Sequence, residues 1–140
     1  MEEATVTGQT KNVGFEIGAR KTFPVSFEEA WNFLFSNKGL PIWLGQLEPA
    51  GLALGQAYET TGGITGKVTV WVPMSHIRLR WKKKEWNHYS ILQMRLLRVK
   101  EKTTISFHQE HLQDTLQRNE MSLHWKEVLA QLNHAFTLKH

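Results

Sequence analysis

The chain has 140 residues and no cysteine, and its 17 Lys and Arg outnumber its 13 Asp and Glu, which gives a formal net charge of +4. Domains span roughly 100–200 residues, so we expect a single domain over residues 1–140 with its core at about 13–136. The lack of cysteine excludes disulfide scaffolds, thiol catalysis and thiolate zinc sites. The charge is too small to indicate nucleic acid binding, and the six Trp and seven Phe instead predict a thick core or a lined pocket.

Neither a membrane span nor a signal peptide is expected. No stretch approaches 18 consecutive apolar residues, which a transmembrane helix requires. Residues 1–4 are acidic and lack the apolar core of a secretory signal. The sequence therefore predicts a cytoplasmic protein.

The N-terminal third predicts one strand and two short helices. Alternating apolar residues over 13–23 are typical of a strand, which Pro24 ends. Ser26 and Glu29 then form a capping box, in which each side chain can bond the other residue's backbone amide. A second short turn covers residues 42–44. The first helix carries one apolar stripe, made of Phe27, Ala30, Trp31, Leu34 and Phe35.

From residue 45 to about 112 the apolar period is two, and glycines separate the segments. Ile77, Leu79 and Trp81 alternate with Arg78, Arg80 and Lys82, which predicts an antiparallel strand with one buried and one solvated face. The alternation slips within 96–99, which indicates either a bulge or a strand end. The predicted strands cover residues 56–61, 66–72, 76–83, 90–99 and 103–109.

The strongest helix signal lies at the end of the chain, after a cap at either Asp114 or Asn119. The predicted fold class is α+β, with a curved antiparallel sheet of about six strands and all helices on one face. A long C-terminal helix across a curved sheet leaves a cleft between them. The apolar face of this helix contains Met121, Trp125, Val128, Leu129, Leu132 and Phe136.

Four stretches in this order resemble a known family. They are residues 23–31, with the proline turn and helix start, residues 39–45, residues 66–81 and residues 125–132. The chain is similar to the START-like (SRPBCC) superfamily, in the branch named after the activator of the 90-kDa heat-shock protein ATPase. The resemblance implies the helix-grip fold, in which a curved sheet wraps around a long C-terminal helix and two short helices follow the first strand.

The resemblance also implies a cavity between the sheet and the helix, because helix-grip domains commonly enclose one. We therefore expect a binding module for an unidentified lipophilic or amphipathic small molecule. The same side chains could instead fill the space as a solid core. Possible polar anchors are Tyr58, Gln93, Gln109 and His124. The predicted lining consists of Trp31, Phe35, Trp43, Tyr58, Val68, Val70, Leu79, Trp81, Leu92, Met94, Phe107, Gln109, Met121, Trp125 and Leu129, with Ile105 beside them.

No catalytic residue, metal or cofactor is predicted from the motifs. Val68 follows Gly66-Lys67 where a phosphate loop needs Ser or Thr, and a strand follows where it needs a helix. His108 and His111 face opposite sides of a strand, so they are not expected to share a metal with His124. Some START-like relatives are cyclases or hydrolases, which leaves an enzyme as a second alternative.

A protein–protein module is the first alternative, as in the heat-shock ATPase activator. Basic residues on the outer face of the sheet would suit an acidic protein partner, such as a chaperone, better than nucleic acid. The chain could be a monomer, or a homodimer joined through an apolar end near Trp43. The basic residues are Arg78, Arg80, Lys82, Lys83, Lys84, Arg95, Arg98, Lys100 and Lys102.

Overall fold

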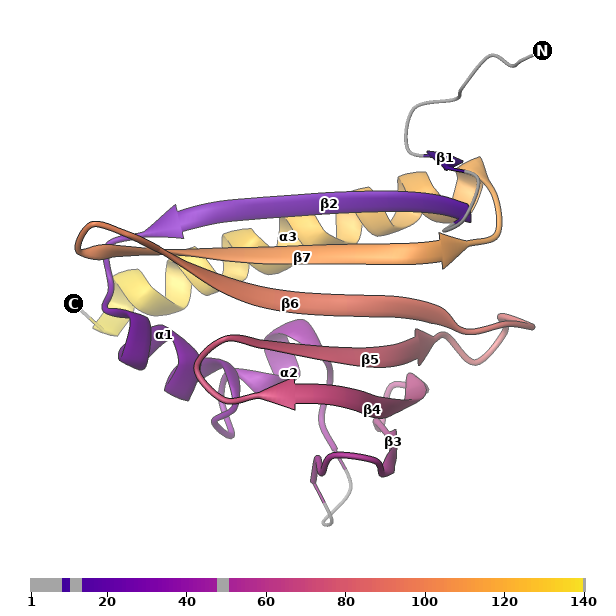
Figure 1. The fold of residues 1–140 in the computed structure, drawn as a ribbon, viewed down its shortest axis with the longest axis horizontal. Coiled ribbons are helices and arrows are strands. Elements are labelled where there is room, and N and C mark those ends of the chain that lie inside the picture. Colours follow the sequence, from indigo (N-terminus) through magenta and orange to yellow (C-terminus); the bar gives the residue numbers. More distant parts are fainter. Residues whose placement is uncertain (1–8, 11–13, 48–50, 140) are drawn as a thin grey trace.

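A computed structural model describes residues 9–10, 14–47 and 51–139. Figure 1 shows one twisted sheet with the longest helix behind β2 and β7, where it runs along most of the length of these strands. The sheet is antiparallel throughout, with strand order β1-β2-β7-β6-β5-β4-β3. The elements are β1 (Gln9–Thr10), β2 (Gly14–Phe23), α1 (Phe27–Leu34), α2 (Leu40–Trp43), β3 (Ala57–Glu59), β4 (Thr65–Val72), β5 (His76–Lys82), β6 (Ser90–Val99), β7 (Lys102–Leu112) and α3 (Thr115–Lys139).

The structure confirms the predicted α+β layout, with two short helices after the first long strand and one long C-terminal helix. Strand β1 was not predicted. The largest differences from the predicted bounds are in β3, which has three residues, and in β7, which continues to Leu112, while β2, β4 and β5 differ by one residue at one end. The slip predicted within 96–99 is a strand end. The β6–β7 register runs without a shift to Val99, while Leu97 and Val99 are 40% and 44% exposed.

Side-chain caps fix where the helices begin. The Ser26 hydroxyl accepts from the Glu29 amide at 3.0 Å, as the capping box predicts. The Asp114 carboxylate accepts from the Gln117 amide at 2.8 Å, so Asp114, and not Asn119, begins α3. This start places the apolar stripe of α3 against the sheet, where Met121, Trp125 and Leu132 are fully buried.

The junction between α1 and α2 depends on a glycine. A Cβ atom at Gly39 would lie 1.8 Å from the Phe33 carbonyl oxygen, so no other residue fits there without a backbone shift. The close approach lets the Trp43 indole N–H donate to the Leu34 carbonyl at 2.7 Å. The Ser36 hydroxyl donates to the Phe33 carbonyl at 2.6 Å. These contacts hold both helices at one end of the sheet.

A buried polar chain ties α3 to the centre of the sheet. The Trp125 indole N–H donates to Gln109 Oε1 at 2.8 Å, and Gln109 Nε2 donates to the Ser90 hydroxyl at 2.8 Å. The Ser90 hydroxyl donates to the Trp81 carbonyl at 2.5 Å. Ser90, Gln109 and Trp125 are 0% exposed, so the chain satisfies groups that water cannot reach.

We predict that Gly39→Ala destabilises the protein by about 2 kcal/mol, because the added methyl group meets a backbone carbonyl that cannot rotate away. Urea denaturation followed by circular dichroism measures the change. Gly62→Ala is the matched control, since its nearest neighbour would be the Thr60 hydroxyl at 3.9 Å. Equal midpoints for the two variants would contradict the prediction.

Gln109→Leu should cost about 1–3 kcal/mol of unfolding free energy, because it leaves the buried Trp125 N–H without an acceptor. The comparison variant is Gln93→Leu, which changes the same residue type on the half-buried outer face of β6. The free energies of unfolding of the two variants, measured from urea denaturation curves, test this prediction. If Gln109→Leu is no less stable than Gln93→Leu, the buried chain does not have the proposed role.

Candidate functional site

The predicted cavity residues lie together between the sheet and α3, where they pack on one another. All but Phe35 and Val70 are buried, with at most 6% of each side chain exposed. The Phe107 and Trp125 rings stack with centroids 4.6 Å apart, and Trp43 and Trp81 extend the ring cluster at 6.2 Å and 6.3 Å. Aromatic contacts therefore run through the predicted lining.

Val70 departs from the prediction because of a β-bulge. Between Val68 and Val70 strand β4 advances two residues while β5 advances one, so the alternation of side chains reverses. Val70 consequently faces outward and is 36% exposed. Trp71 takes the inner position instead and stacks on Phe35 with ring centroids 5.1 Å apart. A strict period of two places Val70 inside and Trp71 outside, so the sequence pattern did not predict the inward position of Trp71.

The predicted polar anchors have different surroundings. The buried Tyr58 hydroxyl donates to the Arg80 carbonyl at 2.5 Å, and burial raises the pKa of Tyr58 above its ordinary value. Gln109 belongs to the buried chain described above, whereas Gln93 lies on the outer face, opposite Arg78 and His108 on the neighbouring strands.

His124 lies near the start of α3, against two tryptophans. Its ring lies 4.6 Å from Trp125 and 6.1 Å from Trp81, measured between centroids. Burial lowers the pKa of His124, and the nearby Lys83 ammonium acts in the same direction. Lys83 forms an ion pair with Glu120, which joins the loop after β5 to α3.

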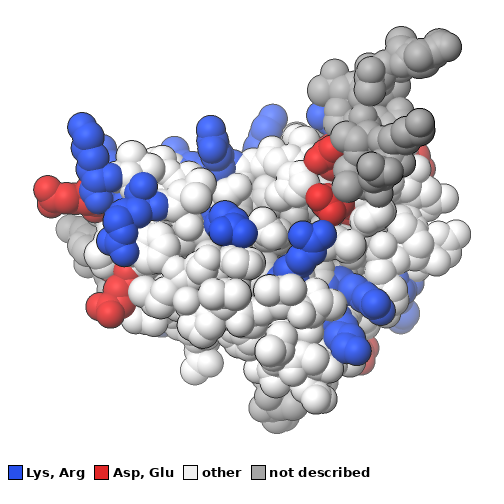
Figure 2. Space-filling view, in the orientation of Figure 1, with Lys and Arg blue, Asp and Glu red and all other residues white. Residues whose placement is uncertain are grey.

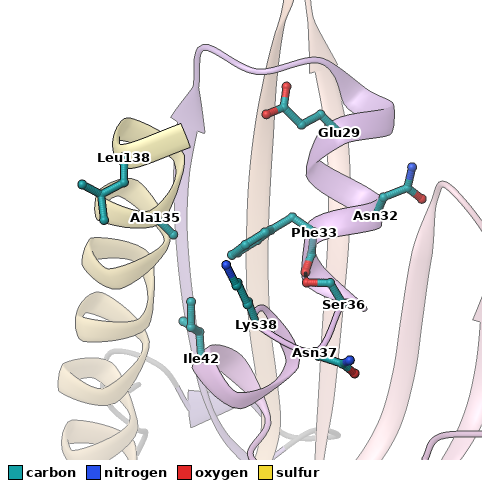
Figure 3. A pocket seen from close by; sticks show the side chains of 9 residues that line it. All are labelled: Glu29, Asn32, Phe33, Ser36, Asn37, Lys38, Ile42, Ala135 and Leu138. Carbon is teal, nitrogen blue, oxygen red and sulfur yellow. Dashed lines mark hydrogen bonds between the residues drawn. The ribbon is translucent and has the colours of Figure 1, made fainter. Parts of the chain in front are cut away.

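An open hollow lies at the other end of α3, between that helix, α1, α2 and the segment that joins α1 to α2 (Figure 3). We call it the helix-end groove. Its volume is about 860 Å³, which falls in the range of about 300–1,000 Å³ found for small-molecule sites. The lining residues are Glu29, Asn32, Phe33, Ser36, Asn37, Lys38, Ile42, Ala135 and Leu138.

The groove combines an apolar wall with polar groups. Phe33 points from α1 toward α3, where its ring lies 5.2 Å from that of Phe136. Ile42 and Ala135 add apolar surface from α2 and α3. Lys38 extends toward Phe33 in Figure 3, and its side chain forms no ion pair within the described residues. Glu29 adds a carboxylate from α1. The arrangement suits a molecule with an apolar body and an anionic group that lies beside Lys38.

Sequence reasoning missed this groove. Phe33 lies off the apolar stripe of the first helix. An apolar residue outside the stripe is the sequence signal that could have indicated an apolar surface on this side of the helix. Lys38 and Ile42 come from the short connection and α2, whose relation to α3 depends on the close approach at Gly39. No spacing rule connects Ile42 with Ala135.

The three histidines weighed as zinc ligands do not converge. His108 Nε2 lies 2.7 Å from Glu16 Oε1 on the outer face of the sheet, while His124 packs against the inner tryptophans. His111 accepts through its backbone carbonyl from the His88 ring at 3.0 Å. The three imidazoles therefore do not form a common metal site in the described structure.

The outer face of the sheet is basic, as predicted. Ile77, Leu79 and Trp81 are buried, whereas Arg78 and Arg80 of the same strand face outward. Figure 2 views the molecule from the side of the sheet and shows Lys and Arg spread across it, with fewer acidic side chains. Arg98 is engaged elsewhere, 4.5 Å from the Phe27 ring centroid. No helix among the described residues is long and apolar enough to cross a membrane.

Solved structures similar to this chain share its fold. CalU16 from Micromonospora echinospora matches with a TM-score of 0.76 and 16% identity over 86% of this chain and 73% of that one. The Aha1 dimer from Colwellia psychrerythraea matches with a TM-score of 0.68 and 20% identity, over 86% of this chain and 94% of that one. An HSP90 activator from Plasmodium falciparum matches with a TM-score of 0.59 and 22% identity, over 69% of this chain and 73% of that one. These likenesses confirm the helix-grip fold.

No curated protein matches the chain. The family model described as "Activator of Hsp90 ATPase homolog 1-like protein" matches residues 24–137, which begin at the turn after β2 and end in the last turns of α3. The match covers most of the sequence and includes every element that forms the helix-end groove. The chain therefore belongs to the family of Activator of Hsp90 ATPase homolog 1-like proteins.

Proposed function

We propose that this chain is a binding module that holds a small amphipathic molecule in the helix-end groove. The observation that carries the proposal is a hollow of about 860 Å³ with an apolar wall and a lysine ammonium beside it. Ligand sites are typically concave and mostly apolar, with a few polar groups that orient the ligand. The groove has this composition.

The proposed site differs from the enclosed cavity that the family resemblance predicts. The rings of Trp43, Phe107 and Trp125 contact one another where that cavity would lie, so a ligand there would have to displace packed aromatic side chains. The groove lies at one end of the seam between sheet and helix and is already open. We therefore propose the groove as the site of first binding.

The groove also indicates the ligand's chemistry. An alkyl chain against Phe33, Ile42 and Ala135 would lose water-exposed surface, and burying about 200 Å² contributes roughly 5 kcal/mol before the entropic costs of binding. Lys38 favours an anionic head group over a neutral one. Because Lys38 is exposed, its ion pair contributes at most about 1 kcal/mol. A fatty-acid-like carboxylate meets both requirements.

Dodecanoate should raise the melting temperature of the protein and bind with 1:1 stoichiometry in calorimetry. Ala135→Trp should abolish both effects, because an indole at this position fills the groove. The matched control is Leu116→Trp, which adds the same ring to the first turn of α3, where Leu116 is 80% exposed. Undiminished binding to Ala135→Trp would place the ligand elsewhere.

Lys38→Met should weaken dodecanoate binding about fivefold, which is the effect of losing an exposed ion pair of about 1 kcal/mol. Dodecanol binding should stay unchanged, since it lacks the carboxylate. Calorimetry with both compounds separates the charge contribution from the apolar one. Equal losses for the acid and the alcohol would contradict the role given to Lys38.

The family match favours a second candidate, a domain that contacts an Hsp90-type chaperone in the cytoplasm. The basic outer face would then meet an acidic surface of the chaperone, with Arg78 and Arg80 at its centre. In this case the wild-type chain changes the chaperone's ATPase rate, and Arg78→Glu with Arg80→Glu removes the change. Lys126→Glu, an exposed position on α3, serves as the control for charge reversal. An ATPase rate that the wild-type chain does not alter would exclude this candidate.

A further inference from the structure

A bulge near the end of β7 brings two carboxylates face to face on the outer surface of the sheet. Phe15 pairs with Leu112 and Ile17 with Gln109, so β7 contains one more residue than β2 in this interval. Glu16 consequently lies opposite Glu110 and His111, and His111 has the left-handed φ of 62° that accommodates the extra residue. Like charges opposite each other on adjacent strands are destabilising unless a cation lies between them.

His108 lies between the two carboxylates and contacts both. Its Nε2 is 2.7 Å from Glu16 Oε1, and its Nδ1 is 3.7 Å from Glu110 Oε2. The second carboxylate oxygen, Glu110 Oε1, lies 3.3 Å from Arg78 Nη2. One potential ligand atom from each of Glu16, His108 and Glu110 lies within 4.8 Å of the other two.

The contacts leave two acceptors facing each other. The short contact to Glu16 requires a proton on Nε2, and in the neutral tautomer with that proton the Nδ1 lone pair faces Glu110 Oε2. A separation of 3.7 Å is too long for a hydrogen bond. Two ligands of one metal, each about 2.0–2.2 Å from it, lie roughly 3–4 Å apart, so the gap has the width of a metal site.

We propose that His108 Nδ1 and Glu110 Oε2 bind a divalent transition metal ion, with Glu16 as the carboxylate that orients the imidazole. A histidine ligand usually donates its other N–H to a carboxylate, which fixes the tautomer and the ring. Arg78 orients Glu110 in the same way through its other oxygen. Imidazole and carboxylate without thiolate suit Zn²⁺, Ni²⁺ or Cu²⁺.

The site is open, because His108 and Glu16 keep 37% and 24% of their side-chain surface exposed. Water therefore completes the coordination, and the ion exchanges readily. The site lies on the face of the sheet opposite the helices, so it is independent of the helix-end groove and of the function proposed for it. A metal-free alternative is an imidazolium that bridges the two carboxylates.

The test is calorimetry of the full chain with Zn²⁺ after treatment with EDTA, together with the melting temperature with and without Zn²⁺. We expect one ion per chain and a higher melting temperature. His108→Ala and Glu110→Gln should each remove both effects. Glu16→Gln should weaken binding about 10–100-fold, as expected for an orienting partner.

His76→Ala is the matched control, since His76 lies on the same face and bonds Ser75 instead of a carboxylate. It should leave Zn²⁺ binding unchanged. Circular dichroism confirms that each variant is folded, and the conservative Glu110→Gln keeps the test decisive if His108→Ala unfolds. Absence of Zn²⁺ binding to the wild type supports the imidazolium bridge and overturns the proposal. Binding that survives both substitutions and is lost with His88→Ala or His111→Ala overturns it as well.

Discussion

The contact between Trp125 and the centre of the sheet is the interaction on which the rest of the structure depends. The indole stacks on Phe107 and donates its N–H to Gln109, so one side chain provides both apolar contact and hydrogen-bond specificity. A helix held only by apolar contact could rotate or slide, because dispersion and burial are non-directional. The hydrogen bond fixes the rotation of α3, and with it the positions of Leu132 and Phe136 about two and three turns further on.

This packing is consistent with an open hollow at the end of the helix. Rings from α2, β5, β7 and α3 meet in the middle of the seam, whereas toward the end of α3 the partners are β2 and the short helices. There Phe136 contacts Phe23 and Phe33, and the groove lies open beside Phe33. The apolar wall of the proposed ligand site thus comes from Phe33 at the edge of the helix–sheet seam, and several of its polar groups come from the connection between α1 and α2.

The sequence predicted the fold well because local signals dominate it. Capping residues, alternating apolar positions and the stripe of α3 are all readable within one element, as Ser26 and the Ile77-to-Trp81 segment show. The remainder depends on relations between elements. Three such relations leave no local pattern in the sequence. They are the bulge that turns Trp71 inward in place of Val70, the close approach of Gly39 to Phe33, and the register that sets Glu16 opposite Glu110. The groove and the carboxylate–histidine cluster therefore required the three-dimensional structure.

The pairing of β2 with β7 has a consequence for how the protein folds. Residues such as Gly18 and His108 are adjacent in the sheet and far apart in the sequence, whereas β4 to β7 form a meander of neighbouring hairpins. Closing a long loop costs chain entropy before the contact returns any stability, so non-local pairing slows folding. The meander can form first and offer an unpaired edge on β7, which β2 then covers. Until it does, that exposed edge is the part of the chain most prone to pair with another molecule.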